Sequence, residues 1–358
     1  MVAIAVIGGG VSGLVAAWAA RRHGCDAVVF EAGPRLGGRA VTASHGQALF
    51  DTGAQFFRTE GGAAEELILH QLDPGDLLDI RAEVRPFVTG GAVGDGDPAQ
   101  NALPKWVYRR GIGQLASVLA RASGATIHLG WRCDRLVRAG ETWTVEGAAG
   151  RAGPFEAVVV TPPPPVLCPI LERSTFDRGA REALLQALES ARYRPIISVT
   201  SGFHEPFRGP DGAYALVNID RGHAISWLAF EHEKPGYVPA GHGVITAQMG
   251  ADWSRPRMTL GDESLAREAF AQVQGLLGDE LPRQAWTHVT RWPAALPDVL
   301  VPAERLQAAE HLGLFAAGDC TAGGRVHLAV ESGMVAGERL GSWLSSRTRD
   351  GAARGPVR

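Results

Sequence analysis

The sequence predicts an α/β fold in which a Rossmann-type domain holds an inserted α+β domain built on an antiparallel sheet. An apolar strand and a glycine-rich turn open the chain at Val2–Gly13, and a second apolar strand ends in a Gly-Asp pair at Gly313–Asp319. Between these two segments, runs of strand length separated by turn residues recur from residue 196 to 249, a spacing typical of an antiparallel sheet. One domain interrupted by another accounts for this order.

The composition is that of a globular protein without an unusual charge. Of 358 residues, 45% are hydrophobic and 20% charged, and the net charge is −3. This charge gives no reason to expect a nucleic-acid partner. The four cysteines lack metal-binding or disulfide spacing, so no metal site is predicted and a reducing cytosol is expected. Because no apolar run reaches membrane-spanning length, we expect a soluble cytoplasmic protein with no membrane association.

The first element is a strand–turn–helix unit followed by a second strand. Val2–Ile7 is the first strand, Leu14–His23 the helix, and Ala27–Phe30 the second strand, which ends at Glu31. Glycines in such a turn allow a pyrophosphate to approach the backbone, and the helix N–H groups face the phosphates. A carboxylate about twenty residues past the turn binds the ribose hydroxyls. The predicted dinucleotide contacts are Gly8, Gly10, Ser12, Gly13 and Glu31.

Two short blocks follow, and each has two interpretations. In Arg35–Thr42 a glycine pair lies between two arginines, which suits a phosphate or a flat ring edge with Arg39 supplying charge; a basic surface turn fits equally. In the second block, Gly53 and Ala54 leave room for a flat ligand and Gln55 offers it an amide. The alternative for this block is a strand end with a tight turn.

Taken together, the dinucleotide turn, R-x-G-G-R-x-x-T at 35–42 and D-x-G-A-Q-F at 51–56 resemble the flavin amine oxidase superfamily. Within that superfamily the chain looks most like the renalase-like flavoproteins, which the short motifs Ser226-Trp227, Lys234-Pro235-Gly236 and Asp252-Trp253-Ser254 also resemble. The resemblance implies FAD as the cofactor and a p-hydroxybenzoate-hydroxylase-like two-domain architecture. We expect the FAD to be non-covalent, because Cys320 lies in a different motif from the cysteine that tethers flavin in monoamine oxidases.

The remaining elements are assigned in chain order. The predicted helices are 63–71, 115–122 and 263–277, and the predicted strands are 81–88, 125–129, 132–137, 142–146, 155–161, 196–203, 213–219, 224–231, 244–249 and 285–292. The run Pro162–Pro165 lacks backbone donors and predicts an extended connector into the second domain. The resulting division is 1–60, 103–163 and 304–345 for FAD binding, and 61–102 and 164–303 for the substrate. Residues 346–358, rich in Arg, Gly and Ala, are predicted to be a disordered tail.

The C-terminal return supplies the last predicted cofactor contacts. After the strand ending at Gly318 and Asp319, a helix is predicted from His327 to Leu344. The resemblance implies that the aspartate binds the ribityl chain or phosphates, that this helix points its N-terminus at the flavin, and that the backbone near Cys133 touches adenine. A helix dipole stabilises the negative charge that hydride transfer places on the flavin. Cofactor contacts are also assigned to Leu328 and Val330.

One departure from the family lies at the start of this helix. Relatives usually carry an acid and then a glycine where this chain has His327-Leu328. The leucine side chain is expected to affect how the flavin is seated. His327 is either a proton donor near the flavin or a helix-cap residue.

The resemblance implies an oxidase that gives the hydride of a small substrate to FAD and releases H2O2 from O2. The implied substrate is an isomeric 2- or 6-dihydronicotinamide dinucleotide, a strong hydride donor that needs positioning more than acid–base chemistry. No catalytic dyad or triad is evident, so the catalytic residues are unassigned. The candidates are Trp227 and Trp292, as walls of a flat slot or as core residues, and His288 and Arg291, as ligands of a pyrophosphate or carboxamide or as structural pairs.

Two alternative functions also fit the sequence. An amine or other C–H oxidase of the same superfamily is one alternative, and a flavin-binding protein without turnover is another. The lysine that holds a water against the flavin in many amine oxidases has no evident match, because neither Lys105 nor Lys234 lies in a matching context. The oligomeric state is not indicated.

Overall fold

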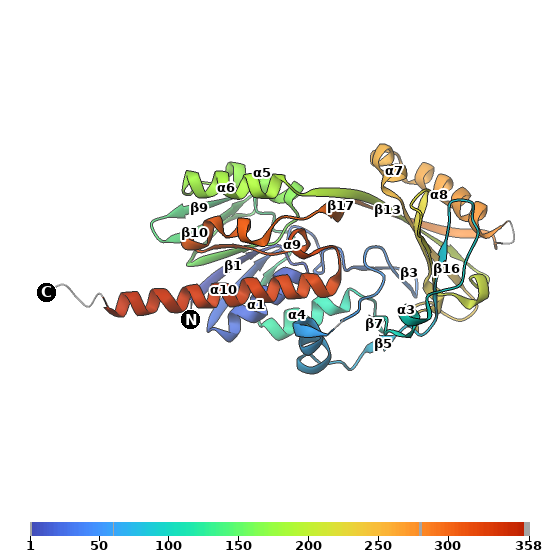
Figure 1. Cartoon of the computed structure of the whole chain (residues 1–358), viewed down its shortest axis with the longest axis horizontal. Helices are drawn as coiled ribbons and strands as arrows, with labels where there is room; N and C mark the ends of the chain where they lie inside the picture. The colour runs from blue at the N-terminus through green and yellow to red at the C-terminus, as the bar shows by residue number, and fades with distance from the viewer. Residues whose placement is uncertain (1, 60, 279–280, 354–358) are drawn as a thin grey trace.

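The computed structural model describes residues 2–59, 61–278 and 281–353. A parallel sheet with the long C-terminal helix lies at one end of the molecule, and an antiparallel sheet lies at the other (Figure 1). This arrangement confirms the predicted fold class. Among the described residues, no helix combines the length and apolar character needed to cross a membrane, and no group of three His, Cys, Asp or Glu side chains is placed to hold a metal ion.

The nucleotide half is a five-stranded parallel sheet with the order β18-β12-β1-β2-β8. Its strands are β1 (Val2–Ile7), β2 (Cys25–Phe30), β8 (Thr126–His128), β12 (Ala157–Val160) and β18 (Leu314–Ala316). The central strands are apolar because helices cover both faces, as is usual for parallel sheets. Alternate residues of β1 point to opposite sides: Ile4 and Val6 into one core cluster, Ala5 and Ile7 into another.

On one face of this sheet, α1 (Val11–Arg22) packs against α10 (Val326–Ala353) (Figure 1). Glycines on α10 allow the close contact: a Cβ on Gly333 would lie 2.3 Å from Ser12 O, and one on Gly337 would lie 2.5 Å from Ala19 Cβ. α4 (Gln114–Ser123) lies beside α1 on the same side. The helices α1 and α10, whose N-termini face the candidate site, are thus packed closely in one layer.

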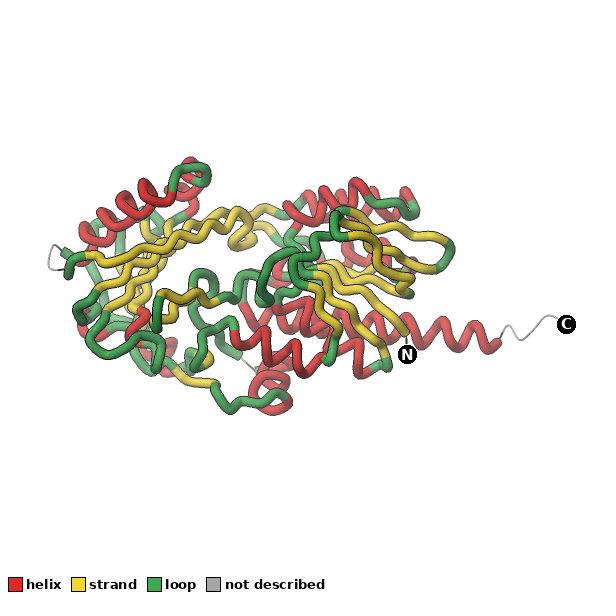
Figure 2. The backbone as a smooth tube through the Cα atoms, turned by 180° about the vertical axis from the view of Figure 1, so that it is seen from behind, coloured by secondary structure: helices red, strands yellow, loops and turns green. Residues whose placement is uncertain are grey.

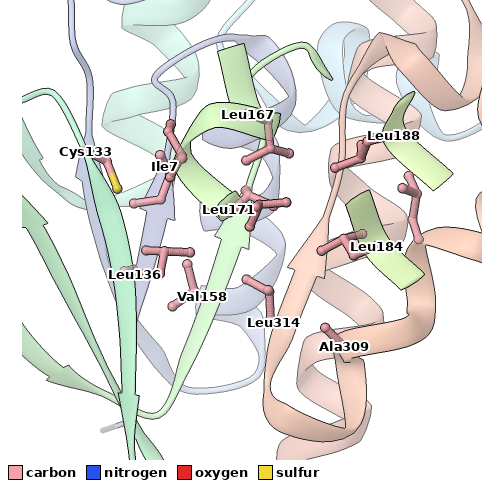
Figure 3. Packing of buried hydrophobic residues seen from close by; sticks show 14 of the residues in the cluster. Ile7, Cys133, Leu136, Val158, Leu167, Leu171, Leu184, Leu188, Ala309 and Leu314 are labelled. Atoms are coloured by element: carbon pink, nitrogen blue, oxygen red, sulfur yellow. The ribbon is translucent and has the colours of Figure 1, made fainter. Parts of the chain in front are cut away.

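The other face is covered by two helices and a three-stranded meander. These are α5 (Pro164–Arg173), α6 (Arg178–Glu189), β9 (Arg135–Ala139), β10 (Thr142–Gly147) and β11 (Gly150–Phe155). Figure 3 shows side chains of this core, in which Leu171 of α5 and Leu184 of α6 join Ile7, Val158 and Leu314 of the sheet.

Only the first half of the proline run forms the predicted extended connector. Pro162 and Pro163 are not helical, but Pro164 begins α5, because proline's fixed φ suits the first turn of a helix and its missing N–H costs nothing there. Since α5 and α6 belong to the core of the parallel sheet, we propose that the chain passes into the antiparallel sheet at residue 192 and not at residue 164.

The second half is a six-stranded sheet with the order β17-β13-β16-β15-β14-β6, antiparallel except that β6 runs parallel to β14. Its strands are β6 (Val84–Phe87), β13 (Arg192–Phe203), β14 (Ala215–Asn218), β15 (Ile225–Phe230), β16 (Gly243–Met249) and β17 (Gln284–Val299). The helix α8 (Asp262–Leu277) covers one face through Leu265 and Ala269. The other face is turned toward the nucleotide half, where Phe50 and Phe56 pack against it.

Strands β13 and β17 form a ribbon that joins the two halves (Figures 1 and 2). At one end Phe203 pairs with Gln284, and at the other Arg192 pairs with Val299 beside α6. The register shifts near Ile196 let the ribbon bend as it leaves the sheet. This ribbon reaches the candidate site from the side of the antiparallel sheet.

Smaller elements complete the chain. They are β3 (Thr42–His45), β4 (Ala48–Asp51), α2 (Gly62–Glu65), the π-helix η1 (Glu66–Gln71), β5 (Leu77–Asp79), α3 (Pro98–Ala102), β7 (Trp106–Tyr108), η2 (Pro210–Gly212), η3 (Glu231–Glu233), α7 (Ala251–Ser254), η4 (Arg255–Arg257), η5 (Ala303–Leu312) and α9 (Asp319–Ala322). The expected helix 63–71 is thus an α turn followed by a π-helix, and strands β5 and β7 pair with each other.

The predicted disordered tail is wrong for residues 346–353, because α10 continues to Ala353. Arg347 lies 4.8 Å from the ring of Trp343 and pairs with Glu141, which holds the helix against the meander. Alanine and arginine, read as signs of disorder, are also strong helix formers. Residues 354–358 lie outside the described part of the chain.

Candidate cofactor site

The glycine turn between β1 and α1 has two sides. On one side close contacts leave no room for a Cβ atom, and the other side is open. Gly8 has a φ of +101°, and a Cβ there would lie 2.5 Å from Thr161 Oγ1. A Cβ on Gly13 would lie 2.1 Å from Gly8 O. A Cβ on Gly10 would meet nothing within 4 Å. No side chain caps α1 and its first turn holds no acid, so its free N–H groups and positive dipole end face this open side.

Glu31 lies where the second strand ends, beside the same turn. Its Oε2 accepts a hydrogen bond from the Gly9 N–H at 2.7 Å, and its Oε1 accepts one from the Gly33 N–H at 2.6 Å. The carboxylate and the glycine turn therefore form one surface, as the dinucleotide pattern predicts.

The segment after β2 packs directly on the turn. Gly37 N donates to Gly9 O at 2.9 Å, and Gly37 and Gly10 form a parallel bridge. Gly37 and Gly38 have φ values of +110° and +58°, which favour glycine. This geometry places the backbone of the R-x-G-G-R block directly beside the glycine turn.

Arg39 and Asp319, which are 280 residues apart in the chain, meet in this cradle. Arg39 Nη1 lies 2.7 Å from Asp319 Oδ2, and Nη2 lies 2.8 Å from Oδ1, a bidentate pair. The Tyr193 hydroxyl also donates to Oδ1, at 2.8 Å. Burial alone disfavours the charged guanidinium, but Asp319 outweighs burial and raises the pKa of Arg39. The arginine also donates to the carbonyls of Ala294 and Ala295, each at 3.1 Å, and so ties β17 to the cradle.

The loop 51–55 is held by side chains from the antiparallel sheet. Ser198 Oγ and Trp292 Nε1 both donate to Thr52 O, at 2.6 and 2.7 Å. Gln248 Nε2 donates to Gly53 O at 2.5 Å. Trp292 therefore anchors the loop through its indole N–H, a role that the sequence did not indicate.

The other side of this loop rests on Arg39. Ala54 N donates to Arg39 O at 2.9 Å, and a Cβ on Gly53 would lie 2.0 Å from the same oxygen. Only glycine fits at residue 53. The small residues of the motif thus bring three chain segments together, which contain the glycine turn, Arg39 and the loop 51–55.

A buried charge cluster lies beneath the loop. Lys234 Nζ is 2.7 Å from Asp51 Oδ2, 2.8 Å from Glu231 Oε2 and 3.3 Å from Gln55 Oε1. The side chains of Lys234, Asp51 and Glu231 are each 0% exposed. Tyr237 adds a hydrogen bond from its hydroxyl to Asp51 Oδ2 at 3.0 Å.

Sequence reasoning placed Lys234 in an ordinary turn and missed this cluster. The available signal was a rare lysine, one of two in the chain, with an acid three residues before it and a tyrosine three residues after it. Gln55 was expected to offer its amide to a ligand. In the structure its Nε2 donates to Asp51 O and its Oε1 accepts from Lys234, so the amide is bonded within the protein.

Burial and charge pairing together set the protonation of the cluster. Burial raises the pKa of Glu231 to about 7, against the opposing effect of Lys234. Burial lowers the pKa of Lys234, but Asp51 and Glu231 outweigh it and the net shift is upward. The ammonium therefore stays charged at neutral pH, while Glu231 exchanges its proton near neutrality.

The candidates on the last strand separate according to the alternation of β17. Trp292 and His288 face the nucleotide half, and the His288 ring lies 5.2 Å from that of Phe50. Arg291 faces the other way, where it pairs with Asp262 of α8 at 2.7 Å and donates to Met258 O at 3.1 Å. Arg291 is therefore a structural residue outside the candidate site, because neighbouring residues of a strand point to opposite faces.

Trp227 lies on the sheet face that meets the loop. Its ring is 6.0 Å from that of Phe56 and 6.2 Å from that of Tyr214. Its Nε1 is buried and has no hydrogen-bond partner among the described residues.

The start of α10 brings together the other assigned residues. Val330 is fully buried in the cluster that contains Val11 of α1, and His327 is buried as well. Leu328 Cδ1 lies 3.2 Å from the position that a Cβ on Gly323 would occupy, so this leucine packs against the loop that follows Asp319. Gly318, with a φ of +139°, donates its N–H to Ser332 Oγ at 2.9 Å, which fixes that loop to α10.

The assigned cysteine contributes a thiol to the core and not to the cradle. Cys133 faces Ile7 and Leu136 (Figure 3), and burial raises the pKa of its thiol to about 12. Burial also raises the pKa of Cys320 to about 12. Both thiols are therefore protonated and unreactive at neutral pH.

These features define the class of the protein. A Rossmann-type turn with an open helix N-terminus, an acid at the end of the second strand and an Arg–Asp pair from both ends of the chain fit an FAD, and the protein is an FAD-dependent oxidoreductase. Residues 89–340 match the family of flavin-containing amine oxidoreductases, and residues 6–70 match an NAD(P)-binding Rossmann-like domain. The first match spans more than half of the chain, so the chain belongs to the flavin-containing amine oxidoreductase family.

Solved structures show the same fold across nearly the whole chain. A protein described as a putative protoporphyrinogen oxidase from Exiguobacterium has a TM-score of 0.78 at 16% identity, covering 95% of this chain and 99% of its own. Cyclohexylamine oxidase from Brevibacterium oxydans has a TM-score of 0.72 at 15% identity, covering 96% and 99%. Putrescine oxidase bound to putrescine has a TM-score of 0.67 at 14% identity, with the same coverage.

Proposed function

We propose that the protein is an oxidase that takes hydride from a small reduced substrate, with an isomeric 2- or 6-dihydronicotinamide dinucleotide as the first choice. One observation carries this proposal. The side chains that reach the loop 51–55 from β13, β16 and β17 are neutral donors, namely Ser198, Gln248 and Trp292. The ammonium of Lys234 is held by two carboxylates. A dihydropyridine gives up hydride without first losing a proton, so such a neutral setting suits it.

Bound FAD would accept the hydride, and its reoxidation by O2, with one proton from solvent, would release H2O2. The chain's own contribution is binding and orientation. The N–H groups of α1 and the Arg39 guanidinium would bind the pyrophosphate and balance its negative charge. The α10 N-terminus, whose first turn holds no acid, would favour negative charge beside it.

Trp227 is the residue that we assign to the substrate side. Its buried N–H has no partner among the described residues, and a buried donor left unpaired costs about 1–3 kcal/mol. An acceptor on a flat substrate, such as a carboxamide oxygen, would satisfy it while the indole ring covers the substrate face.

An amine oxidase is the second candidate, supported by the family itself and by the names of two structural neighbours, which are a cyclohexylamine oxidase and a putrescine oxidase. Amines would give an iminium product and would require the ammonium form to lose a proton before hydride transfer. A flavin-binding protein without turnover is a third candidate, and Leu328 at the start of α10 is the feature that favours it.

Anaerobic mixing of the purified FAD-loaded protein with single substrates separates the three candidates. We expect 2- and 6-dihydronicotinamide dinucleotides to bleach the visible flavin band rapidly, and H2O2 to appear once O2 is admitted. Bleaching by amines alone would establish the second candidate. A flavin that no donor in either panel reduces would establish the third.

A further inference from the structure

Lys234 contacts the loop 51–55, although the two are far apart in the sequence. It follows η3 in the antiparallel half, and its side chain reaches Asp51 and Gln55 of the nucleotide half, which are 183 and 179 residues away in the chain. Each of the charged groups is fully buried. The contact therefore joins the two halves directly beneath the loop.

Oxygens of three side chains surround the ammonium. A lysine has three donors and no acceptor, and here it donates to Asp51 Oδ2 and Gln55 Oε1 and forms an ion pair with Glu231 Oε2. Because the ammonium only donates, the amide oxygen of Gln55 must face it. The Gln55 NH2 group is thereby turned toward Asp51 O, to which it donates.

Stability alone does not account for this arrangement. Replacing a buried ion pair by apolar side chains of similar volume is often neutral or stabilising. The charges do fix one orientation of an amide that would otherwise have two, and they fix it at the residue that closes the loop. The carbonyls of Thr52 and Gly53 are clamped from the opposite side by Ser198, Trp292 and Gln248.

We propose that Lys234 is a positioning residue for the cofactor: it orients the Gln55 amide and holds Asp51, and so sets the backbone of residues 53–55 against the flavin. Gln55 then acts as a brace inside the loop and not as a ligand through its amide. This inference rests on the proposed placement of FAD along the loop and does not depend on which substrate is oxidised.

The test is a double-mutant cycle on FAD binding to the full-length apoprotein. One arm is Gln55→Met. The other is the paired change Lys234→Met with Asp51→Asn, which removes both charges together so that no carboxylate of this pair is left buried alone. Each variant is measured for its FAD dissociation constant, the shape of the bound flavin spectrum and the flavin reduction potential.

We expect each arm to weaken FAD binding about tenfold, which corresponds to about 1.4 kcal/mol, and to alter the spectrum. Combining the arms should add less than twofold, because both act through the same loop. Multiplying effects would overturn the proposal, and so would a folded paired variant with the wild-type dissociation constant, spectrum and potential.

Two further measurements keep the test decisive. Gln55→Met alone leaves the ion pairs intact, so wild-type FAD binding and spectrum in that variant would overturn the proposal even where the paired variant does not fold. Lys105→Met is the matched control, since Lys105 is also a buried lysine and its Nζ donates to Asn101 O, away from the loop. Failure of wild type to oxidise either substrate class would count against the proposed function and leave these binding readouts intact.

Discussion

The two halves of the molecule hold the candidate site by different means. The nucleotide half uses mainly backbone, namely glycines with positive φ, free N–H groups at α1 and a turn that packs on Gly10, together with the Arg39–Asp319 pair. The antiparallel half uses side chains that reach across from β13, β16, β17 and the turn after η3. At Gly8 and Gly13, where a Cβ would collide with neighbouring atoms, the backbone tolerates no side chain. The antiparallel half depends instead on charge pairing and on individual donors.

The largest expected loss of stability comes from a substitution in the antiparallel half. Lys234→Met leaves Asp51 and Glu231 buried without their cation, so the free energy of unfolding should fall by about 3–5 kcal/mol. Urea unfolding monitored by circular dichroism measures it. Adding Asp51→Asn should restore much of the loss, and a single variant as stable as wild type would show that the cluster is not charged.

The next largest effect is a pH dependence of folding stability that arises from Glu231 in the antiparallel half. Because burial raises the pKa of Glu231 from 4.5 to about 7, the folded protein binds this proton more tightly than the unfolded chain does. Its contribution to stability is complete below pH 4.5 and is lost as the pH rises toward 7, to an extent of at most about 3 kcal/mol. Unfolding curves across this range should show a steeper decline for wild type than for Glu231→Gln. Parallel curves would contradict the assignment.

A substitution in the glycine turn of the nucleotide half should change cofactor affinity and leave stability unchanged. Gly10 has φ −74° and ψ 177°, values open to any residue, and a Cβ there meets nothing. Gly10→Ala should therefore leave the apoprotein's unfolding within about 0.5 kcal/mol of wild type. FAD affinity should fall at least about tenfold, since the added methyl enters the cradle.

Gly261 provides the control for that change. It also precedes a helix in an extended conformation with open space around it, at α8. Gly261→Ala should alter neither stability nor FAD affinity. Equal FAD affinities for the two alanine variants would place the cofactor elsewhere.

The smallest effect is expected at a single donor. Trp292→Phe removes the indole N–H from Thr52 O, but Ser198 still donates to the same oxygen, so stability should fall by only about 1 kcal/mol. Trp286→Phe, on the same strand and against His45 and Phe50, serves as the comparison. A loss of several kcal/mol at residue 292 alone would mean that the two donors are not interchangeable.

The same division explains what the sequence predicts and what it does not. Gly8 to Gly13 and Glu31 could be assigned because a strand–turn–helix unit places its contacts within a short stretch of chain. Arg39 and Asp319 could each be assigned to the cofactor from motifs at the two ends of the chain, but their direct ion pair was not predicted. Lys234 could not be assigned, because its partner Asp51 comes from a distant part of the chain. The two interpretations of Arg291 stayed open, because the sequence does not tell which face of a strand meets a partner, and the structure favours the structural pair. Pro164 and residues 346–353 were misread because proline and alanine-rich runs suit helix starts and helices as well as connectors and tails.

The position of β18 has a consequence for how the protein is made on the ribosome. This strand, residues 314–316, pairs with β12 at the edge of the parallel sheet, and Asp319 follows it at once. The glycine turn and Arg39 emerge from the ribosome first, and their acidic partner is made 280 residues after Arg39. The Arg39–Asp319 pair therefore cannot form on the ribosome until the chain between its two members has been synthesised.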